Sequence, residues 1–406
     1  MIINKYRGIQ AAVNFILKNN ILIILAALVV YSGTMSGCSG ENGNAGEKSQ
    51  PVTESRFMLG TLVDLTIYEG ENSTVFRKAF NLISEYENML SRNIDTSEIS
   101  LINKNAGKLP EPVSVDTLYA INKGLDYSVL TDGLFDISIG PLVTLWGIGT
   151  ESARLPSDPE IKRAVELTDY KKIFITSDTN SSPGLPAGSK SADVETAENN
   201  TSKSLTKNLL TSGETVFSGK SVFLSKEGMA IDLGAVAKGF IADKVLELFK
   251  ANGVKSAIIN LGGNVLLLGT KPEGIPFKIG IQNPFDLRGS YLGIIKASDL
   301  SIVTSGIYER YFEADGKKYH HILNPKTGYP VENDIMGISV ITGKSIDGDC
   351  LSTSLFMLGS VKAVDLVEKL ENTEAVIITK DKKIILSSGA EKIFSLIDND
   401  FTISGN

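Results

Sequence analysis

A carboxylate and a hydroxyl lie four residues apart near the end of the chain, at Asp349 and Thr353. They precede an apolar run at 355–358, so a helix through this segment would place both oxygens on one face. Oxygen ligands of this kind suit a hard cation such as Mg²⁺. A structural role is the alternative, because an Asp before an apolar helix commonly caps it and a Thr one turn later commonly bonds to the backbone. The spacing alone leaves both interpretations open.

The two histidines of the chain are adjacent, at His320 and His321. An imidazole can accept a proton close to neutral pH, since its ordinary pKa is about 6.5. A histidine beside Ile322 and close to Pro325 is, however, more often a packed or turn residue than a catalyst. The pair therefore indicates either a proton acceptor or a structural turn.

A third group of residues, 229–243, combines an apolar lead-in, a turn and the start of a helix. The lead-in ends at Asp232, Gly234 permits a tight turn, and the apolar residues that follow have helical spacing. The free N–H groups of the first helical turn, with Lys238 beside them, would bind a phosphate. In the alternative, Asp232 caps the helix and Lys238 is solvated.

These segments belong to a series of motifs that resembles, in the same order, the FAD:protein FMN transferases, also known as the ApbE lipoproteins. The matching segments are 57–61, 131–143 with Trp146, 232–243, 260–264, 304–306, 321–328 and 349–353. An ordered series is far more specific than any one of its motifs.

The resemblance implies transfer of FMN from FAD to a Thr or Ser hydroxyl of an acceptor protein, with release of AMP and formation of a phosphoester. Mg²⁺ would be held by Asp349, Thr353 and the backbone carbonyl of Ala235, next to the pyrophosphate. His321 would remove the proton of the attacking hydroxyl. Contacts with FAD are implied for Met58, Leu134, Phe135, Asp136, Asp232, Lys238, Ile322, Thr304, Ser305 and Gly306.

The chain departs from the family pattern at a few positions. Relatives often carry an aromatic residue against the flavin at Asn93, Asp at Asn324 and another oxygen-bearing residue at Ser352. The segment 388–391 resembles a flavin acceptor motif but ends in Glu, so self-modification is not expected. The acceptor should be a separate exported or membrane-associated redox protein.

Two other functions are compatible with the same residues. A FAD pyrophosphatase would use water in place of the acceptor hydroxyl and release FMN and AMP. A non-catalytic flavin-binding lipoprotein would have no need of Asp349 and Thr353.

The composition and the N-terminal segment bear on location. The net charge of −7 argues against a nucleic-acid-binding surface. Basic residues precede an apolar run at 21–30, which is shorter than the roughly 20 residues of a membrane span. Small residues then lead to Cys38, which predicts a lipoprotein signal peptide at 1–38 and a lipidated Cys38 anchored on the extracytoplasmic side. An uncleaved anchor is the alternative.

The remaining chain is predicted to form one catalytic domain. A polar, glycine-rich tether is expected at 39–55, the domain at 56–400, and a low-complexity surface insertion at 176–215. Cys350, the one thiol left after lipidation, is expected to be a small buried residue.

The hydrophobic periodicity predicts an α+β fold with mixed, largely antiparallel sheets and packed helices. Strands are expected at 56–68, 172–175, 257–260, 265–269, 277–281, 291–297 and 335–342. Helices are expected at 75–91, just after Ser97, and at 116–130, 158–167, 236–248, 361–370 and 391–397.

Overall fold

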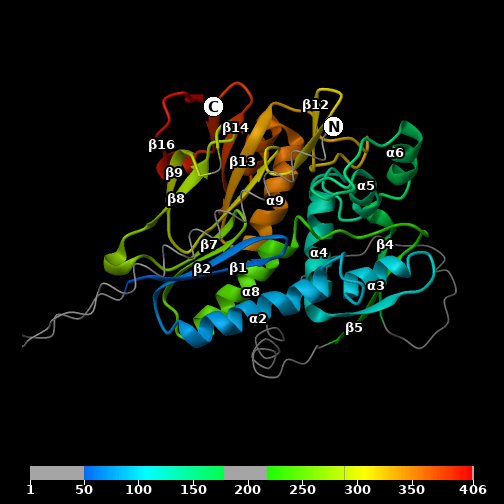
Figure 1. The fold of residues 1–406 in the computed structure, drawn as a ribbon, viewed down its shortest axis with the longest axis horizontal. Helices are drawn as coiled ribbons and strands as arrows, with labels where there is room; N and C mark the ends of the chain where they lie inside the picture. Colours follow the sequence, from blue (N-terminus) through cyan, green and yellow to red (C-terminus); the bar gives the residue numbers. More distant parts are fainter. Residues whose placement is uncertain (1–49, 178–216, 288, 405–406) are drawn as a thin grey trace, which may run out of the picture. The chain divides into compact units, whose positions relative to one another are not determined.

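The computed structural model of the protein describes residues 50–177, 217–287 and 289–404. A nine-stranded sheet runs through the described part of the chain (Figure 1). The strand order is β1-β2-β6-β7-β10-β13-β14-β15-β17, and only the β15–β17 pair is parallel. The predicted α+β class with largely antiparallel sheets is confirmed. The strands are β1 (Val52–Met58), β2 (Thr61–Glu69), β6 (Ser256–Leu261), β7 (Asn264–Leu268), β10 (Ser301–Gly306), β13 (Ile335–Thr342), β14 (Glu374–Thr379), β15 (Lys383–Leu386) and β17 (Thr402–Ser404).

Three smaller sheets accompany it. They comprise β3 (Glu111–Ser114), β5 (Phe217–Leu224) and β4 (Ile173–Ser177); β16 (Phe394–Leu396), β9 (Tyr291–Ala297) and β8 (Phe277–Gln282); and the ribbon of β11 (Tyr311–Ala314) with β12 (Lys317–His320).

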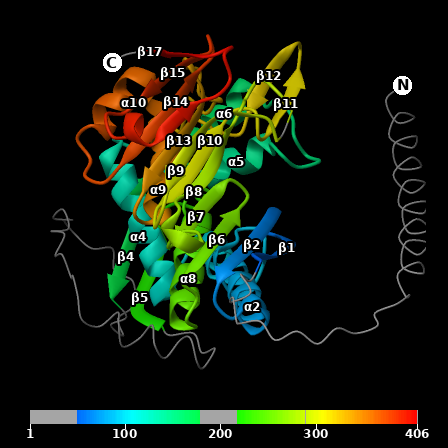
Figure 2. The same ribbon diagram turned by 90° about the vertical axis from the view of Figure 1, so that its left-hand side faces the viewer.

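The helices of the described residues pack against the large sheet, against the smaller sheets or against one another. They are α2 (Ser73–Leu90), α3 (Glu98–Lys104), α4 (Val115–Leu130), α5 (Gly140–Trp146), α6 (Asp158–Val165), α8 (Ala237–Ala251), α9 (Ser345–Leu358) and α10 (Ser360–Val367). Figure 2 shows β6, β7, β10 and β13 running beside α8 and α9, and these helices also contact each other.

Alternation along the strands separates two hydrophobic cores. In β7, Leu266 and Leu268 join the core formed with α2 and α8, whereas Leu267 faces the core formed with β8 and β9. Neighbouring side chains of a strand point to opposite faces, so one apolar strand serves both cores.

The buried face or N-terminal cap predicted for three of the helices is confirmed. The apolar face of α2 is buried, including Phe76 and Phe80. Ser97 caps α3 by accepting a hydrogen bond from the Ser100 amide at 3.0 Å. Ser157 and Glu160 form a capping box at the start of α6.

Two predicted elements are wrong. The single strand expected at 56–68 is a hairpin that begins earlier, at Val52, and turns at Leu59 and Gly60, whose φ angles are 55° and 67°. The helix expected at 391–397 is a 3₁₀ turn followed by β16, because Phe394 and its neighbours pair with β9. Pairing across strands outweighs helical spacing in so short a segment.

Thr176 and Ser177, the first two residues of the predicted insertion, belong to β4 and pair with β5. The rest of it, 178–215, lies outside the described residues, as do the predicted signal peptide, Cys38 and the first part of the tether. None of the helices in the described ranges has the length and hydropathy of a membrane span.

Candidate functional site

The contact between the first turns of α8 and α9 brings together residues that lie more than a hundred positions apart. Gly239 permits it, because a Cβ on Gly239 would lie 2.3 Å from the carbonyl oxygen of Ser345. At this junction the Asp349 carboxylate accepts a hydrogen bond of 2.9 Å from the Gly239 amide and lies 3.5 Å from Lys238 Nζ. The structure therefore joins two of the predicted motifs.

Asp349 does not cap its helix. The Asp243 carboxylate of α8 accepts hydrogen bonds from the amides of Ser345 and Ile346 at 2.8 and 3.0 Å, and so caps α9 from outside. Burial of this carboxyl raises the pKa of Asp243 to about 6. Asp349 lies farther along α9, where it is 4% exposed.

Thr353, one turn after Asp349, is half-buried, and no residue of the described ranges accepts or donates a hydrogen bond at its hydroxyl. A helical Thr ordinarily bonds back to the carbonyl one turn earlier. In the described structure, Asp349 therefore does not cap α9 and the Thr353 hydroxyl does not bond to the backbone, which were the two structural alternatives for these residues.

The Ala235 carbonyl is also without a hydrogen-bond donor among the described residues. Helical geometry would pair it with the Gly239 amide, but that amide donates to Asp349. A hydroxyl and a carbonyl oxygen without partners among the described residues thus accompany the Asp349 carboxylate at one junction, and oxygen donors of these kinds are those that Mg²⁺ prefers.

The Lys238 ammonium lies between Asp349 and the Gly234 carbonyl, 3.3 Å from the latter, so a positive charge already occupies this neighbourhood. The described residues hold no cluster of three or more His, Cys, Asp or Glu side chains suited to a metal. A divalent ion here would depend on the mixed oxygen set of Asp349, Thr353 and Ala235.

Asp232 is not a helix cap either, because α8 begins at Ala237. Its carboxylate accepts hydrogen bonds from the Gly234 amide at 2.7 Å and from Arg92 at 2.9 Å, and both side chains of the Arg92 pair are largely buried. Arg92 also donates to Thr144 on α5. Sequence reasoning missed Arg92, since one arginine in a turn gives no signal of a distant carboxylate.

The predicted segment 134–136 lies next to Asp232. The Asp232 amide donates to the Ile137 carbonyl at 2.8 Å. Phe135 is buried, and Leu134 is half-buried. Asp136 points inward, where it accepts hydrogen bonds from the Ser138 amide and hydroxyl and from the Tyr170 amide, and burial raises its pKa.

Met58 and Ile322 come from two other segments. Met58 ends β1 just before the hairpin turn and is half-buried against the α2–α8 core. Ile322 is buried among residues of α9 and β13. No hydrogen bond or ion pair between described residues ties the side chain of either one to the α8–α9 junction.

The segment 304–306 ends β10 beside α9. Thr304 and Ser305 bond through their hydroxyls to Ser339 at 2.7 Å and to Ser352 at 2.9 Å. Ser352 also donates to the Asp349 carbonyl at 3.0 Å. The Ser352 hydroxyl is thus engaged within the protein, unlike that of Thr353.

The two histidines differ in how many of their ring nitrogens form hydrogen bonds. His320 Nε2 donates to the Val331 carbonyl at 2.9 Å, and its Nδ1 accepts from the Ile322 amide at 3.3 Å. His321 Nδ1 lies 3.2 Å from the Arg310 carbonyl, which can only accept, so the neutral ring carries its proton on Nδ1. His321 Nε2 is left as an acceptor with no partner in the described chain.

Desolvation lowers the pKa of His321 to about 4, and the positive charges of Arg310 and Lys238 act in the same direction. The ring is therefore neutral at physiological pH. The influence of Lys238 also shows that the histidine and the α8–α9 junction lie within electrostatic reach of each other.

The loop that follows His321 is fixed by two residues of the predicted motifs. The Asn324 side chain accepts from the Lys326 amide at 2.8 Å, a role that an Asp at this position would also serve. Trp146 Nε1 donates to the Gly328 carbonyl at 2.8 Å. Asn93, the other departure, is exposed, and Cys350 is buried as predicted.

Comparison with known proteins gives consistent similarities. A family model described as the ApbE family matches residues 59–377. A Klebsiella pneumoniae protein named FAD:protein FMN transferase is 34% identical over 349 residues, covering 86% of this chain and 96% of its own length. A Treponema pallidum protein of the same name is 29% identical over 375 residues, covering 89% and 94%.

Solved structures agree in fold. The ApbE protein from Thermotoga maritima has a TM-score of 0.69 and 26% identity, covering 85% of this chain and 99% of its own. The flavin transferase ApbE from Vibrio cholerae has a TM-score of 0.67 and 24% identity, with the same coverage of both chains.

Proposed function

The chain belongs to the ApbE family, and on that premise we propose that it transfers FMN from FAD to a Thr or Ser hydroxyl of a separate acceptor protein. The chain is a transferase that moves flavin from FAD to a protein, as its relatives are named. The finer parts of the proposal are the phosphoester bond, the release of AMP and the participation of Mg²⁺.

The observation that carries the proposal is the α8–α9 junction. Lys238, the Asp349 carboxylate, the Thr353 hydroxyl and the Ala235 carbonyl share a site near the start of α8. The Ala237 and Gly239 amides of the first turn of α8 already donate to Leu233 and Asp349, so Lys238 is the group that attracts phosphate, while the oxygen ligands attract a hard cation. A pyrophosphate held with its cation is a substrate suited to both.

In the proposed reaction, the acceptor hydroxyl oxygen forms a bond to the phosphorus of the FMN half. The bond from that phosphorus to the oxygen bridging to the AMP half breaks, and AMP leaves with the electron pair. His321 Nε2 takes the hydroxyl proton, for which it is neutral and unpartnered within the described residues.

A divalent cation held by Asp349, Thr353 and the Ala235 carbonyl would offset the negative charge that develops on the AMP leaving group. Lys238 contributes a fixed positive charge to the same region. Asp243 keeps the first turn of α9 in place, and Gly239 keeps α8 close enough for Asp349 to face it.

The FAD contacts are proposed for Met58, Leu134, Phe135, Asp136, Asp232, Lys238, Ile322 and the segment 304–306. Support is best for Asp232 and Lys238, which flank the turn before α8. Arg92 is added to this group as the residue that orients Asp232.

We also propose that the chain is an exported lipoprotein anchored through Cys38 on the extracytoplasmic side, and that its acceptor is an exported or membrane redox protein. The basic residues, the apolar run and the small residues before Cys38 support export and lipidation.

Co-expression with the exported proteins of the same cell tests the transfer, with mass spectrometry used to find a protein that has gained FMN. The purified chain, FAD and Mg²⁺ should then release AMP in step with modification of that protein. AMP release that needs no acceptor would identify a FAD pyrophosphatase, and FAD binding without AMP would identify a flavin-binding protein.

A further inference from the structure

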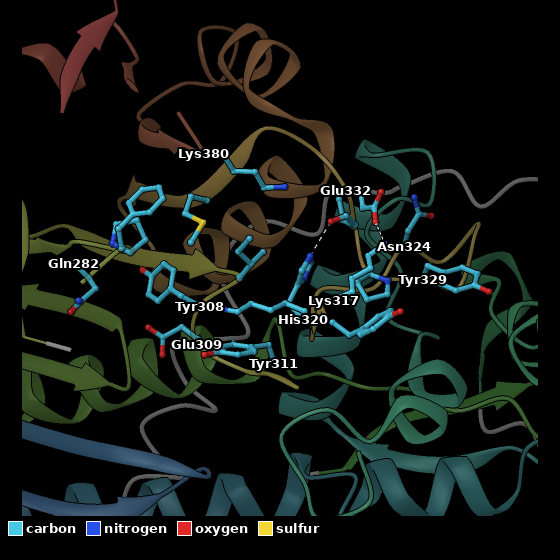
Figure 3. A pocket seen from close by; sticks show the side chains of 18 of the residues that line it. Gln282, Tyr308, Glu309, Tyr311, Lys317, His320, Asn324, Tyr329, Glu332 and Lys380 are labelled. Carbon is cyan, nitrogen blue, oxygen red and sulfur yellow. Dashed lines mark hydrogen bonds and ion pairs between the residues drawn. The ribbon is translucent and has the colours of Figure 1, made fainter. Parts of the chain in front are cut away.

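A large cavity lies beside the β11–β12 ribbon and contains none of the predicted FAD or metal residues. Its volume is about 1020 Å³. Its walls come from the ribbon, the turn after β8, the segment after β10 and the loop that precedes β13. Figure 3 shows Lys380 above this cavity and Glu309 and Tyr311 below it.

The cavity meets the proposed reaction site at two places. Tyr311 pairs with His320 across the ribbon, and the next residues, Arg310 and His321, are joined by two hydrogen bonds. His320 lines the cavity and His321 is the proposed base, so one step along the chain separates them.

The second meeting point is Tyr308, whose ring lines the cavity and packs on the backbone of Gly306. A Cβ on Gly306 would lie 2.3 Å from that ring, which explains why the predicted 304–306 motif ends in glycine. A molecule held in the cavity would therefore lie against His320, the residue before His321, and against Tyr308, which packs on the end of β10.

Several polar side chains that line the cavity have no hydrogen-bond or ion-pair partner among the described residues. The hydroxyls of Tyr308, Tyr311 and Tyr319 form no hydrogen bond with any described residue, and Lys380 and Glu309 have no ion pair in the described ranges. Tyr311 is 42% exposed and Phe285 is 43% exposed. Exposed tyrosines and aromatic rings are enriched where proteins bind other proteins.

The charge of the cavity favours a polypeptide over a dinucleotide. The three lysines Lys317, Lys318 and Lys380 are matched by the three acids Asp286, Glu309 and Glu332, so the lining has no excess of positive charge. Two phosphates would find no complementary field there, whereas a segment with a backbone to hydrogen-bond and side chains of mixed charge would.

We propose that this cavity binds an extended segment of the acceptor protein, next to the hydroxyl that receives FMN, with an acidic side chain of that segment against Lys380. The inference rests on the proposed transfer function and names the surface that holds its protein substrate. Tyr308, Tyr311 and Tyr319 would hydrogen-bond the segment while His321 reaches its hydroxyl from the adjoining side of the ribbon.

Steady-state transfer by the full chain tests this, with FAD, Mg²⁺ and the exported protein found to gain FMN in the co-expression experiment. Tyr311→Ala and Lys380→Glu should each raise the KM for that protein about tenfold, as interface residues do. Tyr291→Ala on β9 and Lys362→Glu on α10 make the same changes at exposed positions outside the cavity and should not.

FAD affinity, measured by flavin fluorescence, should be the same in all four variants. An acceptor KM that matches the controls in both cavity variants would overturn the inference, as would a loss of FAD affinity, which would make the cavity part of the FAD site. Lys380→Glu changes a surface lysine, so it keeps the test valid if Tyr311→Ala does not fold. Absence of protein modification by the unaltered chain would instead reject the transfer function.

Discussion

The α8–α9 junction and the ribbon cavity differ in how fully their polar groups are satisfied. At the junction, Asp349 and Asp243 are buried and held by backbone amides, and among the described residues only the Thr353 hydroxyl and the Ala235 carbonyl of the proposed ligands have no hydrogen-bond partner. In the cavity, the hydroxyls of three tyrosines and the charged groups of Lys380 and Glu309 have no partner in the described chain. A site that performs chemistry has to be fixed before substrate arrives, whereas a surface that recognises a protein leaves its hydrogen bonds for that protein to complete.

Of all the substitutions considered, His321→Ala should change the rate of transfer most. Removal of the general base should lower the rate of transfer about 100- to 10,000-fold while FAD still binds. The measurement is FMN incorporation into the acceptor over time at saturating FAD.

His320→Ala is the matched control. Its two ring nitrogens are both engaged, so its loss leaves the Val331 carbonyl and the Ile322 amide unpaired and should cost about 1–3 kcal/mol of unfolding free energy. Because His320 also lines the cavity, the rate is compared at saturating acceptor, where the transfer rate of the folded variant should stay within a few-fold. Equal loss of rate in both variants would show that the pair acts structurally.

Asp349→Asn should follow in size, with transfer slowed about a hundredfold or more. Asparagine keeps an oxygen for the Gly239 amide but removes the charge that would hold a cation. Titration with Mg²⁺ should show a much higher concentration for half-maximal rate.

Asp347→Asn, two residues earlier on the same helix, provides the comparison. Asp347 pairs with Lys123 and Tyr127 rather than with α8. Its Mg²⁺ dependence should match the unaltered chain. An unchanged Mg²⁺ dependence in Asp349→Asn would remove the cation from this junction.

Gly239→Ala should act on the spacing of the two helices. The added methyl group would meet the Ser345 carbonyl, so the unfolding free energy should fall by about 1–3 kcal/mol, with loss of transfer activity. Gly343→Ala, just before α9, has no atom within 4 Å of the added Cβ and should be nearly neutral. Denaturant unfolding of both variants measures the difference; similar stabilities would mean that the helices are not in close contact.

Sequence alone could predict the parts of the site that depend on local spacing. Asp349 and Thr353 share a helix face because helical geometry relates residues four apart, and the turn at Gly234 is a property of a few residues. The hairpin at Leu59 and Gly60 was missed because apolar residues continue on both sides of it.

The remaining contacts depend on the folded chain. Arg92 meets Asp232 across 140 positions, and Asp243 caps a helix that begins more than a hundred residues later. The cavity draws on several separate segments, each unremarkable in sequence. No periodicity signals such pairings, because the sheet order decides which segments become neighbours.

The smallest expected effect is the pH dependence that His321 gives to transfer. Its pKa in the fold is about 4, below the ordinary value, because the ring is desolvated and lies near the charges of Arg310 and Lys238. The neutral base is therefore present above that pH, so protonation of His321 should leave kcat/KM unchanged from pH 8 to 5 and lower it about tenfold per unit below 4. Circular dichroism at each pH separates this fall from acid unfolding, and the residual activity of His321→Ala should lack it. A midpoint near 6.5 instead would show that the His321 ring is solvated in the free enzyme. The general base would then not be part of the preorganised site that is compared with the open cavity.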